Sequence, residues 1–148
     1  MDCEVKRLSC SHPLQIQMIN RWAQVFQENH KSFRLFPWVE SCSMNPKQFV
    51  YIAFKDNIPC GWMNVELIYK NEWEITMIST RSSKSLMNGV TITGDITFSG
   101  TGSKMIRAFL SDLPKSSIVR VMSAISAVEF YKKMGFQPSS DEYLIYTN

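Results

Sequence analysis

Three consecutive β-type segments, joined by two short turns, constrain the fold of this chain most. Strands are expected over residues 49–54, 60–69 and 73–80, with turns over 55–57 and 70–71. The strands are rich in aromatic and β-branched side chains, and the turns contain Asp and Asn, which tolerate the backbone angles of tight turns. Because strands joined this closely run in opposite directions, the pattern predicts an antiparallel meander.

A strand and a helix are expected before the meander. Residues 4–8 favour a short strand. Ser11 and Pro13 favour a helix start, because a hydroxyl caps the first turn and proline presets its φ angle. The helix is expected to reach about Asn29. Its apolar residues recur at helical spacing and predict one buried stripe, consisting of Leu14, Met18, Trp22, Val25 and Phe26.

The stretch from residue 33 to residue 46 is irregular, with Pro37 and Pro46 as breakers and room for a second short helix. It also carries three aromatic side chains. These fit either the core or the wall of a substrate cleft, and they are Phe33, Phe36 and Trp38.

After the meander, helices and strands alternate. Residues 81–89 are polar and rich in serine, which predicts a loop, and residues 90–98 are strand-like. A helix ending near Asp112 is expected next, with Met105, Ile106, Phe109 and Leu110 on its buried face. A strand over 118–122, a helix over 124–134 and a strand over 143–146 complete the chain, and Gly135 is expected to end that helix as a left-handed cap. This order predicts a single α+β domain over residues 1–148, with a central, mostly antiparallel sheet flanked by helices.

Composition argues against several classes of protein. A net charge of +3 over 148 residues is too small for a nucleic-acid-binding signature, and no apolar run is long enough to span a membrane. The four cysteines form no Cys-x-x-Cys pair, so no metal site is expected. The first residues lack the apolar segment of an export signal, so we expect free thiols and a cytoplasmic protein.

A glycine turn formed by Gly100, Thr101 and Gly102 lies between a strand-like run and a helix. Glycines there let successive N–H groups point at one spot, and the helix dipole adds about half a positive charge. These donors suit a phosphate or pyrophosphate, and Lys104 adds a mobile charge. A plain turn with a helix cap is the alternative. The third glycine of a dinucleotide fingerprint and the Gly-Lys-Ser/Thr triplet of a P-loop are absent.

Taken together, residues 97–136 resemble the GNAT family of acetyl-CoA-dependent N-acetyltransferases. Residues 97–102 are similar to the family's pyrophosphate-binding motif, and residues 127–136, AVEFYKKMGF, are similar to its last helix. One helix and one strand separate the two motifs, as in the family. The resemblance implies acetyl-CoA as co-substrate and no metal. The implied CoA-binding residues are Thr97, Phe98, Ser99, Gly100, Thr101, Gly102, Ser103, Lys104 and Tyr131.

The chain departs from the family pattern at three places. Thr97 stands where the family has Arg or Gln, residues 123–126 lack a common asparagine, and the run 81–96 is longer than the usual link. This length leaves two registers for the strand that faces the pantetheine arm of CoA. It is either residues 72–80 followed by an insertion, or residues 90–93 preceded by an extra strand. The short turn at 70–71 favours the first and the spacing to Gly100 favours the second; we prefer the first.

The resemblance also implies direct transfer of an acetyl group to a primary amine in a ternary complex. Tyr131 matches the family tyrosine that protonates the departing thiolate, although it is otherwise a core aromatic like Phe130. Glu74 lies where some members carry the general base that takes the proton of the amine. Otherwise Glu74 and Glu72 are exposed strand carboxylates.

We therefore expect an N-acetyltransferase acting on an amine-bearing small molecule or protein, with no membrane or nucleic-acid partner. The acceptor is open, and a homodimer is an option because GNAT-like folds often dimerise. One alternative is a GNAT-like domain that binds CoA or a protein partner without catalysis. Another is a small interaction protein whose glycine turn holds no ligand.

Overall fold

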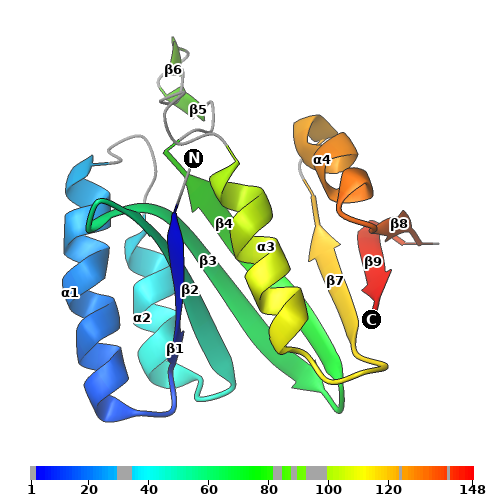
Figure 1. Ribbon diagram of the computed structural model, residues 1–148, viewed down its shortest axis with the longest axis horizontal. Helices are drawn as coiled ribbons and strands as arrows, with labels where there is room; N and C mark the ends of the chain where they lie inside the picture. Colours follow the sequence, from blue (N-terminus) through cyan, green and yellow to red (C-terminus); the bar gives the residue numbers. More distant parts are fainter. Residues whose placement is uncertain are drawn as a thin grey trace.

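A mixed seven-stranded sheet forms the centre of the computed structural model, which describes residues 3–29, 35–81, 85–87, 90–92, 100–123, 125–139 and 141–148. Its strands lie in the order β1-β2-β3-β4-β7-β9-β8 (Figure 1). Neighbouring strands are antiparallel except for β4 and β7, which are parallel. The strands are β1 (Glu4–Ser9), β2 (Gln48–Lys55), β3 (Ile58–Tyr69), β4 (Glu72–Thr80), β7 (Ile118–Met122), β8 (Gln137–Pro138) and β9 (Tyr143–Thr147).

Helices flank this sheet, and the expected α+β class with a mostly antiparallel sheet is confirmed. They are α1 (Pro13–Asn29), α2 (Phe36–Met44), α3 (Thr101–Asp112) and α4 (Val128–Lys133), with a 3₁₀ turn η2 (Ile125–Ala127) before α4. In the part of the chain that the structure describes, no helix is both long and apolar enough to cross a membrane.

The predicted meander is present as β2, β3 and β4. Asp56, Asn57 and Asn71 have positive φ angles of 51°, 64° and 58° in the two connecting turns. Asp and Asn adopt this left-handed region more easily than other residues with a side chain, so the turn chemistry of the sequence explains both reversals.

The helices cover opposite faces of the sheet and bury two separate apolar clusters. On β3, Trp62 belongs to the cluster beneath α1, which includes Phe26. The next residue, Met63, belongs to the cluster beneath α3, which includes Phe109. Successive side chains of a strand point to opposite faces, so this long buried strand supplies both cores.

The buried stripe of α1 differs from the predicted one. Of the predicted residues, Phe26 is fully buried and Trp22 packs against the core, but Leu14 and Met18 are 74% and 42% exposed. Ile19, which was not predicted, is fully buried, and Ala23 is nearly so. The row of Leu14 and Met18 and the row of Ile19 and Ala23 both have helical spacing. They are offset by one residue, which is about 100° around the helix axis. Periodicity alone could not choose between them. Packing against the sheet selects the row of Ile19, Ala23 and Phe26.

The expectation of free thiols is wrong for Cys10 and Cys42, which form a disulfide with a Cα–Cα distance of 5.5 Å. The two residues are 32 positions apart, and the intervening helix α1 returns the chain so that α2 lies beside the end of β1. Sequence spacing carries no signal of that proximity. Free thiols were expected because a reducing setting was expected, and a disulfide between Cys10 and Cys42 does not fit that setting.

The predicted loop over residues 81–89 contains a strand, so that prediction is also wrong in part. Here β5 (Ser85–Met87) pairs with β6 (Val90–Ile92) in a separate two-stranded sheet. Of the strand-like run 90–98, residues 93–98 lie outside the described residues. The central sheet places β4 beside β7, which agrees with the preferred register in which residues 72–80 form the strand at this position.

The helix expected over residues 124–134 is shorter than predicted. Residues 125–127 form the 3₁₀ turn, and the α-helix covers only Val128–Lys133. Its end is as expected, because Gly135 has a left-handed φ of 101° and Phe136 donates its N–H to the Tyr131 carbonyl at 3.1 Å.

Candidate functional site

The glycine turn sits at the N-terminus of α3. Gly100 is the cap residue with a left-handed φ of 86°, and no described side chain caps the helix there. A Cβ at Gly100 would meet no atom of the described residues within 4 Å, so on their side the turn faces open space. The first N–H groups of a helix have no intrahelical acceptor and can donate to a ligand. Thr97, Phe98 and Ser99, the preceding residues of the predicted motif, lie outside the described residues.

Gly61 on β3 allows α3 to approach the sheet closely. A Cβ at Gly61 would lie 2.6 Å from Thr101 Cγ2 and 2.9 Å from Met105 Cε. Such distances are too short for carbon atoms, so only glycine fits without a shift of these side chains or of α3. Gly61 was not among the residues predicted from the sequence. The sequence signal that could have found it is a glycine inside a predicted strand, because such a glycine often marks the close approach of another backbone.

An opening separates the far ends of β4 and β7. The parallel pairing covers only Glu72–Ile75 against Ile118–Val121, whereas β4 continues to Thr80. The two strands diverge toward the end that carries α4 and the start of α3 (Figure 1). Between them is a cavity of about 240 Å³, lined by Ile75, Thr76, Met77, Ile78, Val121, Met122, Ser123, Ala127 and Tyr131.

Tyr131 lies on α4 at the wall of this cavity and is 4% exposed. Its ring makes edge contacts with Phe130 and Phe136, at centroid distances of 5.2 and 5.6 Å. Burial raises the pKa of Tyr131 to about 12. The hydroxyl therefore stays protonated through the neutral range, so it can donate a hydrogen bond or a proton to a stronger base.

Glu74 is held away from this cavity. Its Oε1 accepts from Arg120 Nε at 2.6 Å, and the Arg120 guanidinium lies 4.7 Å from the centroid of the Tyr143 ring. Glu74 is also absent from the cavity lining. The structure thus brings Tyr131 to the opening between β4 and β7, but it places Glu74 in an ion pair where those strands are still joined.

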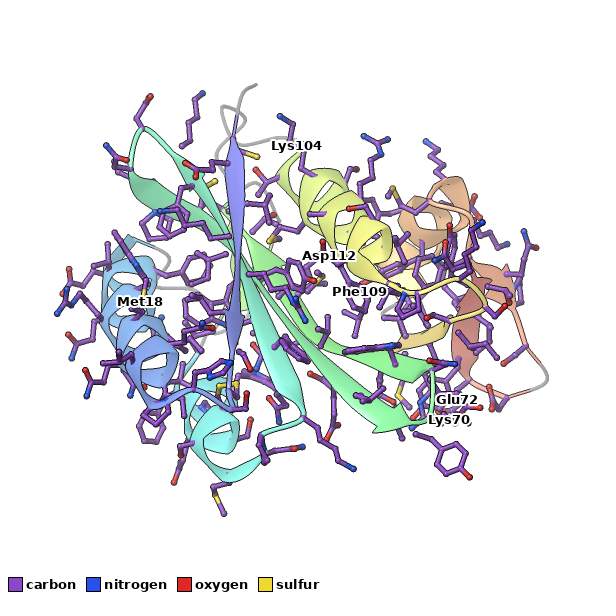
Figure 2. The ribbon with its side chains drawn as sticks, turned by 60° about the horizontal axis from the view of Figure 1, so that its bottom comes forward. Met18, Lys70, Glu72, Lys104, Phe109 and Asp112 are labelled. Atoms are coloured by element: carbon purple, nitrogen blue, oxygen red, sulfur yellow. A yellow bond between two sulfur atoms is a disulfide. The ribbon has the colours of Figure 1, made fainter. Side chains whose placement is uncertain are left out.

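The starting end of α3 faces α4 across a short gap. A Cβ at Gly102 would lie 3.4 Å from Phe130 Cζ and 3.8 Å from Thr80 Cγ2. Gly102, Phe130 and the end of β4 are therefore neighbours. The predicted anion site, the predicted tyrosine helix and the opening form one continuous region. Lys104 lies on the first turn of α3 and is half-buried (Figure 2).

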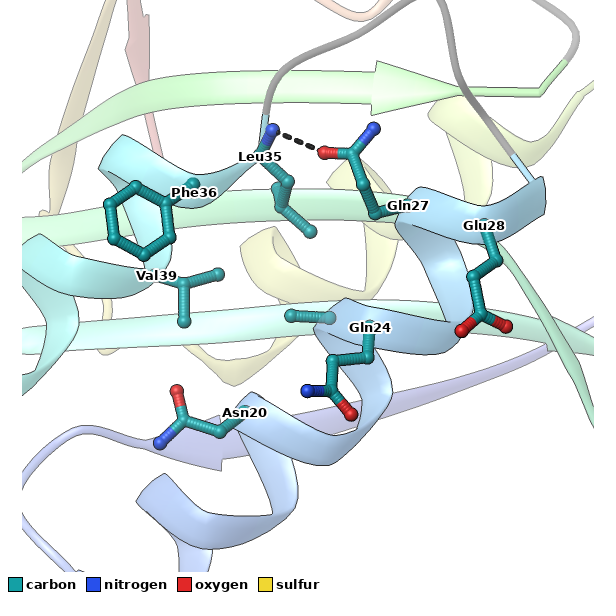
Figure 3. A pocket seen from close by; sticks show the side chains of 8 residues that line it. Asn20, Gln24, Gln27, Glu28, Leu35, Phe36 and Val39 are labelled. Carbon is teal, nitrogen blue, oxygen red and sulfur yellow. Dashed lines mark hydrogen bonds between the residues drawn. The ribbon is translucent and has the colours of Figure 1, made fainter.

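A second, larger pocket of about 670 Å³ lies between α1 and α2. Figure 3 shows its amide-rich rim, in which Gln27 Oε1 accepts from the Leu35 N–H at 2.7 Å. Phe36 lines this pocket and is 73% exposed, whereas Trp38 packs against the core beneath α1. The sequence left these aromatic side chains as either core residues or the wall of a cleft. Phe36 lies on the wall of this pocket, and Trp38 belongs with the core. Phe33 lies outside the described residues.

Within the described ranges, no group of three or more His, Cys, Asp or Glu side chains is placed to hold a metal ion. The described site offers backbone N–H groups, one phenol and a cavity lined mainly by apolar side chains, with the hydroxyls of Thr76 and Ser123.

Known structures with this fold are GNAT acetyltransferases. GCN5 from Tetrahymena aligns over 99% of this chain and 96% of its own, with a TM-score of 0.61 at 9% identity. The PaiA N-acetyltransferase from Thermoplasma acidophilum, in complex with coenzyme A, aligns over 100% of both chains with a TM-score of 0.56 at 13% identity. A GNAT family acetyltransferase from Brucella melitensis, in complex with acetyl-CoA, aligns over 99% and 88% with a TM-score of 0.57 at 12% identity.

No protein-family model and no curated protein sequence matches the chain. The likeness therefore lies in three-dimensional structure, and it extends over the full length of the chain. The chain has the GNAT fold, which confirms the resemblance seen in residues 97–136 at the level of fold.

Proposed function

We propose that this protein is an N-acetyltransferase that transfers an acetyl group from acetyl-CoA to a primary amine. The observation that carries the proposal is the opening between β4 and β7, with Tyr131 on its wall and the uncapped start of α3 beside it. Neighbours of the same fold that were solved with coenzyme A or acetyl-CoA support the choice of co-substrate.

The described residues fit a CoA molecule in two respects. The N-terminus of α3 offers N–H groups and a partial positive charge toward the open space at Gly100, which suits a pyrophosphate. Over Thr76–Ile78, β4 has no partner strand on the β7 side among the described residues, so its backbone groups can bind the amides of a pantetheine arm. Acetyl-CoA would supply the acetyl group as a thioester.

Tyr131 is proposed as the general acid. Its buried hydroxyl remains protonated at neutral pH and can give its proton to the sulfur as the bond from sulfur to the acetyl carbon breaks. The amine must arrive neutral to attack the thioester carbonyl. As the amine attacks, it must lose a proton to a base. Glu74 is less suited to accept this proton than the sequence suggested, because its carboxylate is paired with Arg120. Solvent is the proposed acceptor of the proton.

A CoA-binding domain without catalysis is the second candidate. It is favoured by the ion pair of Glu74 and by the absence of a carboxylate or imidazole from the described lining of the cavity. The two candidates share CoA binding and differ in turnover.

The test is release of free CoA from acetyl-CoA in the presence of a panel of primary amines. For an amine that is turned over, Tyr131→Phe should lower kcat by about 10²-fold, because general acid catalysis contributes about 10²–10⁴-fold. The affinity for CoA should be unchanged. Equal kcat in the variant and the wild type would contradict the acid role. CoA binding without turnover of any amine would favour the second candidate.

A further inference from the structure

A polar pocket of about 370 Å³ lies at the junction of β1 and α1. It is lined by Arg7, Ser9, Ser11, His12, Gln15 and Phe49, and we call it the Arg7 pocket. Its size is at the lower end of small-molecule sites, which range from about 300 to 1,000 Å³. The lining contains a guanidinium, an imidazole, two hydroxyls and an amide, but no carboxylate.

The Arg7 guanidinium is positioned by an aromatic ring and not by an acid. It lies 4.2 Å from the centroid of the Phe49 ring, and among the described residues it makes no ion pair. The facing residue on β2 is Tyr51, whose hydroxyl donates to Asp112 at 2.7 Å. Asp112 is therefore engaged elsewhere, and the planar donors of Arg7 remain for a ligand.

Gln15 and the two serines are oriented as donors by contacts within the pocket. Gln15 Oε1 accepts from the Ser9 N–H at 2.6 Å, which leaves the amide NH₂ of Gln15 to donate. Ser9 Oγ accepts from the Ser11 N–H at 3.1 Å, and the Ser9 and Ser11 hydroxyls share one hydrogen bond of 2.7 Å. That bond uses one hydroxyl hydrogen, so the other is available to an acceptor.

Donors from several directions fit an anion with several acceptor oxygens. A guanidinium binds phosphate and carboxylate oxygens in pairs. A carboxylate has only two oxygens, so Arg7, the serine pair and Gln15 would have to share them. A phosphoryl group has three oxygens, which can accept from Arg7, the serine pair and Gln15 together.

The Arg7 pocket is separate from the glycine turn. Val5 on β1 is paired with Ala53 on β2, and Ala53 is paired with Gly61 on β3. Gly61 lies beside the start of α3. Ser9 is four residues further along β1, which is roughly 13 Å away at about 3.3 Å per residue. The start of α1 and the start of α3 lie at opposite ends of β1 (Figure 1).

We propose that the Arg7 pocket binds the phosphoryl group of a small molecule, at a site distinct from the one proposed for CoA. This site does not depend on the proposed acetyltransferase activity, because none of its residues lines the opening between β4 and β7.

The test is a titration of the ¹⁵N-labelled protein with inorganic phosphate, followed by amide chemical shifts at constant ionic strength. Saturable shifts are expected at Ser9, Ser11 and the side-chain NH₂ of Gln15. Arg7→Ala should weaken this binding by about tenfold or more, since hydrogen bonds to a charged group are lost. Lys6→Ala is the matched control, because it removes the same charge from the neighbouring position, where Lys6 lies over the Phe54 ring instead.

Three outcomes would overturn the proposal: shifts confined to Gly100–Lys104, equal affinities in Arg7→Ala and Lys6→Ala, or shifts that do not saturate. Acetate that binds as tightly as phosphate would contradict the phosphoryl assignment. The amide signals that phosphate does not shift show whether each variant is folded. If Arg7→Ala does not fold, Arg7→Gln keeps the aliphatic stem, removes the guanidinium over Phe49 and should show the same loss.

Discussion

The pKa of Tyr131 is a property that the fold imposes on a single residue. Burial raises it from 10.0 to about 12, so the folded protein holds the phenolic proton more tightly than the unfolded chain does. The stability that this provides is present below about pH 10 and is lost as the pH rises from about 10 to about 12. The loss amounts to about 2–3 kcal/mol at most.

Ultraviolet absorbance of tyrosinate tests this shift directly. The difference between the alkaline titrations of the wild type and Tyr131→Phe isolates one phenol, and its midpoint should lie about two pH units above that of free tyrosine. A midpoint near 10 in the folded protein would show that the hydroxyl is in contact with water.

Gly61 is a second residue whose role follows from a distance. Gly61→Ala should cost about 1–3 kcal/mol, as other overpacked sites do, because the new methyl would meet Thr101 Cγ2 and Met105. The double variant Gly61→Ala with Thr101→Ser removes that methyl of Thr101 and keeps its hydroxyl. It should recover part of the loss in urea denaturation. A double variant no more stable than Gly61→Ala would contradict the proposed clash.

For single residues, the sequence predicted a role correctly where the residue type is suited to one backbone conformation, as glycine is to a positive φ angle. Gly100 and Gly135 were predicted as backbone positions, and both have left-handed φ angles. Glu74 was less predictable, because its ion pair with Arg120 joins residues that lie 46 positions apart. A carboxylate on a strand looks the same in the sequence whether it is a base or one half of an ion pair.

Among the elements, α2 is joined to the end of β1 by a disulfide. The Cys10–Cys42 disulfide closes a loop of 32 residues between the end of β1 and α2. Constraining a loop of this length stabilises a fold by about 3–4 kcal/mol in the chain-entropy model. Cys42→Ser should therefore lower the free energy of unfolding by about that amount.

Equilibrium denaturation measures this loss, with Cys3→Ser as the control, because Cys3 lies outside the disulfide. A reductant should destabilise the wild type and Cys3→Ser but should have no effect on Cys42→Ser. A reductant with equal effects on all three proteins would argue against the Cys10–Cys42 bond.

The elements themselves were predictable to different degrees for physical reasons. The meander and the strand over 118–122 were found because their turns and apolar runs are local signals. The buried face of α1 was found only in part: Phe26 was predicted, but Leu14 was preferred to Ile19 because both lie on rows with helical spacing. The strand β5 was missed because serine-rich segments favour a loop in isolation, and its pairing with β6, which lies in the run predicted as strand-like, overrides that preference.

For the whole molecule, the account predicts that CoA stabilises the folded state. A ligand that binds only the native protein adds about 2.7 kcal/mol at a concentration one hundred times its Kd. For a chain of 148 residues this raises Tm by roughly 5–10 °C. Differential scanning fluorimetry with CoA measures the shift, and adenosine at the same concentration is the control. No shift at saturating CoA would exclude both candidate functions.

The proposed CoA site is the region where Gly100, the edge of β4 beyond its pairing with β7, and α4 meet. Amide hydrogen exchange with and without CoA tests it most directly. The account predicts slower exchange at Gly102 and Ser103 and along Met77–Thr80, and little change in α2. CoA binding that slows exchange only in the pocket between α1 and α2, or leaves the start of α3 unchanged, would contradict it.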